Sequence, residues 1–100
     1  MRLTDLPASH IVRRVVEEGP GSINGVGVAL GVAATAVRRW AFVVGHIPGS
    51  YALAVEEITA GRVTALEVLV EERKHAERGW KNWVYATYRR DHEQFRLFNA

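Results

Sequence analysis

The chain of 100 residues contains no cysteine, which excludes a disulfide framework and any metal site built from thiolates. It also lacks an uninterrupted apolar stretch of the ~18 residues that a membrane-spanning helix needs, so we expect no membrane contact. The segment from Met1 to Pro7 has no long apolar run after a basic region, and therefore predicts no secretory signal. These absences together favour a cytoplasmic location.

Charge is scarce in the middle of the chain. Between Gly19 and Val55 the only charged side chains are those of Arg38 and Arg39. Either this stretch is almost entirely core, or the two arginines act at the surface. The net charge of the whole chain is only +2, so its distribution says more about partners than its total.

The length suits one folded unit, and the hydrophobic pattern is helical. Hydrophobic residues make up 48% of the chain and charged residues 24%, as in ordinary globular proteins. Apolar side chains recur at helical spacing over residues 11–16. We predict a first helix that opens at residues 7–8, with Thr4 or Asp5 as its cap, and that stops at Gly19.

Further helices are expected after this one, although the first of them is rich in glycine and valine and has poor helix propensity. The sequence therefore predicts an all-α fold of about five helices. We expect a domain over residues 1–66, followed by an aromatic-rich helical extension over residues 67–100. The later helices are residues 23–30 after the N-cap candidate Ser22, residues 33–43, a segment opened by Pro48, and a segment whose capping box is Thr64 and Glu67.

The residues from Ser22 to Val43 meet the requirements of a helix-turn-helix. The first helix needs a small residue where the second crosses close to it, and Gly27 supplies one. The turn needs a residue that tolerates positive φ, which Gly31 does. The second helix needs apolar anchors on one face, and Val37 and Trp40 stand at that spacing.

The sequences Ala-Leu-Gly-Val at residues 29–32 and Val-Arg-Arg-Trp at residues 37–40 resemble the helix-turn-helix of Cro/repressor-type regulators. Downstream, Ile-Pro at residues 47–48 and Gly-Arg-Val-Thr at residues 61–64 are similar to the short Cro-like proteins of the YdaS type. The resemblance covers about residues 8–66. It implies a transcriptional regulator, often phage-derived and most simply a repressor, that binds a palindromic operator as a homodimer.

Carried over by position, the resemblance implies contacts to double-stranded DNA. An arginine can make two hydrogen bonds to guanine in the major groove, and a helix N-terminus favours phosphate. The expected base contacts are Ala34, Thr35, Arg38 and Arg39. The expected phosphate contacts are Ser22, Ile23, Asn24, Ala33 and His46.

The resemblance makes residues 33–43 the recognition helix, which would read the major groove, and the chain departs from the family directly after it. Residues 41–44 are apolar, where family members carry polar or basic side chains that hold the DNA backbone. Either the helix runs on and is buried under the C-terminal segment, or it contacts another protein. The aromatic C-terminal region leaves a similar choice between packing on the core, dimerising and stacking on bases. The candidate dimer interface is Phe42, Trp80, Trp83 and Tyr88.

Nothing in the sequence indicates an enzyme, a cofactor or a small-molecule substrate. His10, His46, His75 and His92 are scattered along the chain, and Glu71 stands one turn before His75. Two ligands do not make a metal site, so we expect no metal and predict that these histidines are solvated.

The alternative to a DNA-binding regulator is an assembly or protein-interaction module that uses the helix-turn-helix as a scaffold. A phage terminase small subunit or an adaptor would be of this kind. The apolar residues 41–44 and the aromatic C-terminal region favour it.

Overall fold

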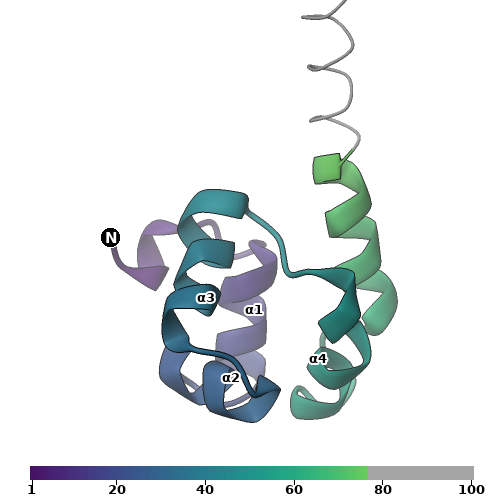
Figure 1. Ribbon diagram of the computed structural model, residues 1–100, viewed down its shortest axis with the longest axis horizontal. Helices are drawn as coiled ribbons and strands as arrows, with labels where there is room; N and C mark the ends of the chain where they lie inside the picture. The colour runs from purple at the N-terminus through teal and green to yellow at the C-terminus, as the bar shows by residue number, and fades with distance from the viewer. Residues whose placement is uncertain (77–100) are drawn as a thin grey trace, which may run out of the picture.

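A computed structural model describes residues 1–76 of the chain, and within that range every regular element is a helix (Figure 1). The all-α prediction is thereby confirmed for these residues. The elements are the 3-10 helix Leu3–Asp5, α1 (Ile11–Glu18), α2 (Ile23–Leu30), α3 (Ala34–Arg39), the π-helical segment Trp40–Val44, the 3-10 helix Gly49–Tyr51, α4 (Ala52–Ile58) and a further helix over residues 65–76.

The first long helix begins later than predicted. It opens at Ile11 rather than at residues 7–8, and neither Thr4 nor Asp5 caps it. The cap is His10, whose Nδ1 accepts a hydrogen bond from the N–H of Val12 at 3.2 Å. The prediction was wrong because Ser, Thr, Asp and Asn are the preferred caps, whereas an imidazole can replace them only through an unprotonated ring nitrogen.

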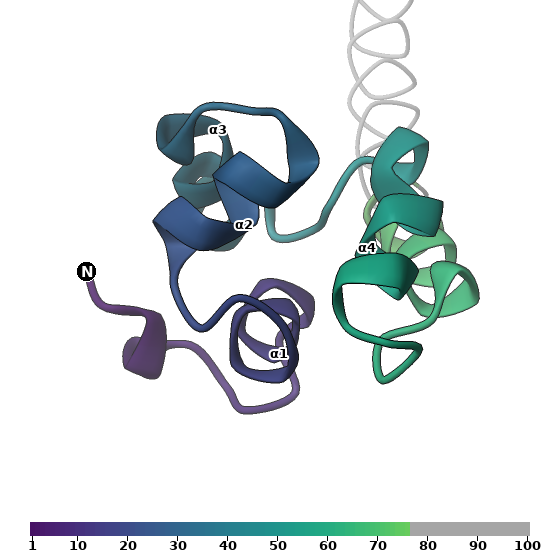
Figure 2. The ribbon, with the colours of Figure 1, turned by 90° about the horizontal axis from the view of Figure 1, so that it is seen from below.

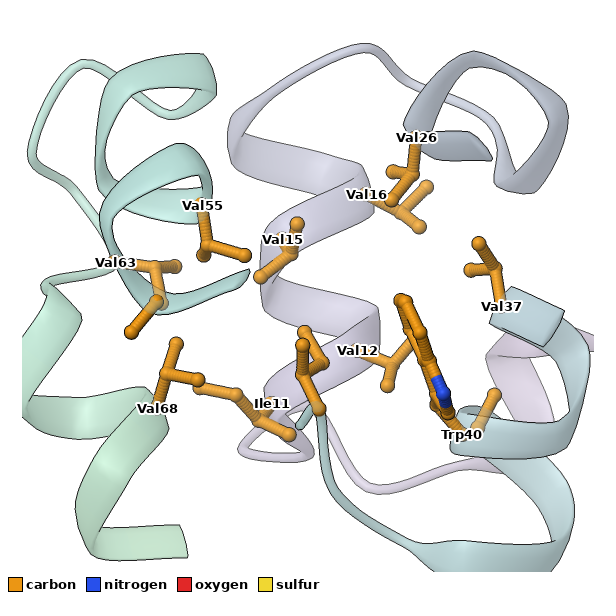
Figure 3. Packing of buried hydrophobic residues seen from close by; sticks show 13 residues of the cluster. Ile11, Val12, Val15, Val16, Val26, Val37, Trp40, Val55, Val63 and Val68 are labelled. Atoms are coloured by element: carbon orange, nitrogen blue, oxygen red, sulfur yellow. The ribbon is translucent and has the colours of Figure 1, made fainter. Parts of the chain in front are cut away.

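Helix α1 lies at the centre of the hydrophobic core (Figure 3). In Figure 3, Val15 points to the side of Val55 and Val63, whereas Val16 points to the side of Val26. Helices α2 and α3 therefore cover one side of α1, while α4 and residues 65–76 cover another (Figure 2). Four side chains of α1 are at most 3% exposed: Ile11, Val12, Val15 and Val16.

The predicted capping box of residues 64–67 is present. The N–H of Thr64 donates to Oε2 of Glu67 at 2.9 Å, and the N–H of Glu67 donates to Oγ1 of Thr64 at 3.2 Å. The bond from the Thr64 N–H lowers the pKa of the Glu67 carboxyl, and the guanidinium of Arg14 lowers this pKa further. The helix over residues 65–76 crosses residue 66, the expected end of the domain. Val68, in this helix, is fully buried in the core. Val68 thus belongs to the same core cluster as the buried residues that precede residue 66.

The turn between α4 and residues 65–76 is organised by Thr59, which is 1% exposed. Its hydroxyl donates to the carbonyl oxygen of Val55 at 2.8 Å and accepts from the N–H of Val63 at 3.1 Å. Ala60 and Gly61 then reverse the chain with φ of +53° and +79°. One buried side chain therefore ties the end of α4 to the segment that leads into the next helix.

Replacing Thr59 with valine removes this hydroxyl while keeping the side-chain shape. We expect Thr59→Val to lower the free energy of unfolding by about 1–3 kcal/mol, because the buried N–H of Val63 loses its acceptor. Amide hydrogen exchange at Val63 should accelerate in Thr59→Val and much less in Thr59→Ser, which keeps the hydroxyl. Equal protection of Val63 in the two variants would contradict this role of Thr59.

Candidate nucleic-acid interface

Helices α2 and α3 are joined by a turn of three residues, 31–33. Gly31 ends α2 in the left-handed conformation, with φ of +72°, and the N–H of Val32 donates to the carbonyl oxygen of Gly27 at 2.9 Å. Across this turn the chain bends by 117° between α2 and the helix from Ala34 to Val44. The second helix thus projects from the first at a steep angle.

Gly27 lies where the turn passes closest to α2. A Cβ atom at this position would be 2.8 Å from the carbonyl oxygen of Val32 and 3.3 Å from the amide nitrogen of Ala34. Both are backbone atoms, so no side-chain rotation could make room. The absence of a side chain at Gly27 therefore allows the contact that sets the position of α3.

Val37 and Trp40 hold the second helix on the core. They are 0% and 7% exposed, and Figure 3 shows both among the side chains that surround α1. The ring of Trp40 also packs on Tyr51, with the ring centroids 5.1 Å apart. The helix spans residues 34–44 rather than the predicted 33–43, because Ala33 is its N-cap and Gly45 ends it with φ of +84°.

The two helices of this pair bury some apolar side chains and leave others uncovered. No single helix within residues 1–76 is long and apolar enough to cross a membrane, although the bent pair as a whole has the length and composition.

The apolar residues after α3 differ in burial. Ala41 is buried in the core, and Phe42 is half-buried against it. Val28 and Val43 are 84% and 74% exposed. The apolar segment 41–44 is therefore neither wholly buried nor wholly exposed.

The opposite face of α3 carries the expected base contacts. Thr35, Arg38 and Arg39 are exposed, and Ala34 is half-buried. Within residues 1–76 the guanidiniums of Arg38 and Arg39 form neither an ion pair nor a hydrogen bond. The positive charge on this face is therefore uncompensated by the rest of the described chain. Three other arginines have a carboxylate oxygen within 3.3 Å, namely Arg13, Arg14 and Arg62.

An open hollow of about 350 Å³ brings part of the expected phosphate contacts next to Arg38. Ser22, Ile23 and Asn24 line it at the N-terminal end of α2. The Oγ of Ser22 accepts the N–H of Gly25 at 2.9 Å and so caps the helix. The positive end of the helix dipole and the guanidinium of Arg38 thus act on the same space, and both favour an anion there.

The other expected contacts lie apart from this hollow. Ala33 is exposed at the start of α3. His46 does not line the hollow, and its ring lies against His75 with the centroids 4.9 Å apart. The roles of Ala33 and His46 toward phosphate stay predictions. Of the candidate dimer interface, Trp80, Trp83 and Tyr88 lie outside the described residues.

The structure also contains a group of histidines that the sequence did not predict. His10, His46 and His75 are each half-buried, so the expectation that they are solvated is wrong. The ring of His46 faces His75, and the imidazole of His75 influences the pKa of His10. No group of three or more His, Asp or Glu side chains within residues 1–76 is arranged to hold a metal ion. No regular spacing links positions 10, 46 and 75, so only folding brings them together.

Comparison with known proteins supplies no relative from which a role could be transferred. No family model, curated protein or solved structure matches the chain. The resemblance to Cro-like regulators therefore rests on the short sequences at residues 29–40 and 47–64 alone.

Placing a methyl group at Gly27 tests whether this contact fixes the turn. Alanine has a better helix propensity than glycine, but we expect Gly27→Ala to destabilise the protein by about 1–3 kcal/mol because the new Cβ overlaps the backbone of the turn. The matched change Val28→Ala, on the exposed side of the same helix, should shift stability by no more than about 0.5 kcal/mol. Urea unfolding measures both, and a Gly27→Ala protein as stable as Val28→Ala would mean that the turn does not depend on this approach.

Proposed function

We propose that the chain binds double-stranded DNA sequence-specifically through α3 and acts as a transcriptional regulator of the repressor type. One observation carries the proposal: Arg38 and Arg39 are exposed and have no ion-pair partner within residues 1–76. They stand on a helix that a short turn sets at 117° to α2. Two helices crossing at about 90–120° across such a turn make up a helix-turn-helix, whose second helix enters the major groove. The buried anchors Val37 and Trp40 leave the outer face of this helix free to do so.

The surroundings of the two arginines favour different roles. Arg38 borders the hollow with Ser22 and Asn24, where the end of α2 favours a phosphate, whereas Arg39 does not line it. We therefore assign Arg38 to the DNA backbone and Arg39, with Thr35, to base edges. In such interfaces phosphate contacts position the protein and base contacts specify the sequence. The sequence alone had suggested base contacts for both arginines.

A homodimer on a palindromic site is part of the proposal. The described domain offers few groups for phosphate, since Asn24 is the only side chain within α2 that can donate a hydrogen bond. Two copies would double the contacts, and half-sites one helical turn apart would present both recognition helices to one face of the duplex. Repression follows most simply, because a small domain can act by occupying its site.

Selection of binding sites from random duplex DNA, followed by titration of the selected site, tests these roles. We expect Arg39→Ala to cost about 1–3 kcal/mol and to relax one position in each half-site. Arg38→Ala should weaken binding to all sequences alike and reduce the slope of log affinity against log salt by about 1 per half-site. The control Arg62→Ala removes the same charge from an arginine that pairs with Glu18, and should bind almost as wild type does.

Two outcomes would contradict the proposal. One is the absence of any consensus sequence among the selected sites. The other is an Arg39→Ala variant whose loss of affinity is uniform across sequences and no larger than that of Arg62→Ala. Either result would show that α3 does not read bases.

The exposed valines favour one second candidate, a helix-turn-helix that serves assembly with other proteins. Val28 and Val43, both more than 70% exposed, would form part of its contact surface. Light scattering coupled to size-exclusion chromatography separates the two candidates. A ring-sized oligomer with weak, salt-sensitive DNA affinity supports assembly, whereas a dimer that selects a palindrome removes it.

A further inference from the structure

Two histidines from distant parts of the sequence, His46 and His75, meet beside the end of the recognition helix, and His10 is near enough for the imidazole of His75 to influence its pKa. His10 caps α1, His46 follows the glycine that ends the Ala34–Val44 helix, and His75 belongs to the helix over residues 65–76. The ring centroids of His46 and His75 are 4.9 Å apart, with the ring planes inclined by 35°. Nε2 of His75 is only 2.9 Å from where a Cβ of Gly45 would lie, so its ring packs directly on that glycine. The cluster therefore joins residues 65–76 to the end of the recognition helix.

The Nδ1 atoms of the three rings have different surroundings. Nδ1 of His10 accepts the N–H of Val12, which requires a lone pair on that nitrogen. Nδ1 of His75 lies 2.8 Å from the carbonyl oxygen of Glu71 and donates to it, which it can do in a neutral or in a protonated ring. Nδ1 of His46 is buried and has no hydrogen-bond partner among residues 1–76. A proton added there would have no acceptor within the described chain, which is costly for a buried donor.

Two carboxylates near the cluster, those of Glu71 and Glu72, belong to the same helix as His75. Burial lowers the pKa of His10, the carboxylate of Glu71 opposes this effect, and the imidazole of His75 adds to it. The carboxylate of Glu71 is itself 3.3 Å from the ammonium of Lys74. The neighbouring Glu72 is engaged with the backbone N–H of Gly49. The carboxylate of Glu71 is thus shared with Lys74, and that of Glu72 is bonded to the loop at Gly49.

We propose that His10, His46 and His75 form an acid-sensitive joint, in which protonation releases residues 65–76 from the end of the recognition helix. Protonation of His46 and His75 would place two like charges on facing rings. Protonation of His10 would remove the acceptor that caps α1. The joint holds the recognition helix against the rest of the fold, so acid weakens the fold whether or not the chain binds DNA.

The direction of the pH dependence follows from linkage. A histidine whose pKa is lowered by folding binds fewer protons in the folded state than in the unfolded state. For His10 the free energy of unfolding therefore falls as the pH drops below the ordinary value of 6.5, and the loss is complete below the lowered folded pKa. For His10 the folding equilibrium changes by on the order of tenfold for each unit by which its pKa is lowered.

Urea unfolding and amide hydrogen exchange test the joint. Both are measured at about pH 7.5 and about pH 5.5, which lie on either side of the ordinary histidine pKa. Wild type should be less stable at the lower pH. Its amide exchange, after correction for intrinsic rates, should accelerate over residues 65–76 and at Val12. His46→Phe/His75→Phe keeps two stacked rings that cannot be protonated, and residues 65–76 should then stay protected. His10→Asn keeps a good cap without a titrating group, and Val12 should then stay protected. Because the pKa of Glu67 is lowered, the capping box of residues 64–67 stays intact at both pH values.

The joint is disproved if wild type is equally stable at the two pH values, or if the acid-induced loss over residues 65–76 is the same in His46→Phe/His75→Phe. If that double variant does not fold, His75→Gln alone removes one of the two facing charges and should show a smaller acid-induced loss than wild type. An undiminished loss in His75→Gln would equally overturn the proposal. His92 is retained in every variant, so its titration contributes alike to all of them.

Discussion

The burial of α1 on two sides is the interaction on which the rest of the described structure depends. A helix of only eight residues, Ile11–Glu18, places two adjacent residues per turn in the core. One side meets α2 and α3, and the other meets α4 and residues 65–76 (Figure 2). Helices this short are marginally stable in isolation, so each pair depends on packing against α1. The orientation of α3 is therefore tied, through α1, to the helices on the far side.

Electrostatics distinguishes the two sides of this arrangement. The charged residues of α1 are used in pairs, with Arg14 near Glu67 and Glu18 near Arg62. Such exposed pairs contribute little stability, but they cancel charge where α1 meets the later helices. Nothing within residues 1–76 cancels Arg38 and Arg39 in this way. A small net charge is thus compatible with a local positive surface on α3.

The Ala34–Val44 helix is held at both ends by glycines that serve different contacts. At its start, Gly27 lets the backbone of the turn approach α2. At its end, Gly45 turns the chain with positive φ and receives the ring of His75. The contact at Gly27 joins backbone to backbone and has no titrating group. The contact at Gly45 involves the imidazole of His75. The contact at the end of this helix therefore includes a side chain that can gain a proton, and the contact at its start does not.

Local features of this protein were determined by the sequence itself. The bounds of α2, the glycine turn after it, and the capping box of Thr64 and Glu67 all depend on hydrogen bonds and backbone angles within a few residues, so a short stretch of sequence contains the information. The start of α1 was missed because the usual capping residues do not include histidine. The meeting of His10, His46 and His75, and the hollow that Arg38 shares with α2, came only from tertiary structure. These contacts join residues far apart in the chain, and their existence depends on how whole helices pack on α1, which no local pattern records.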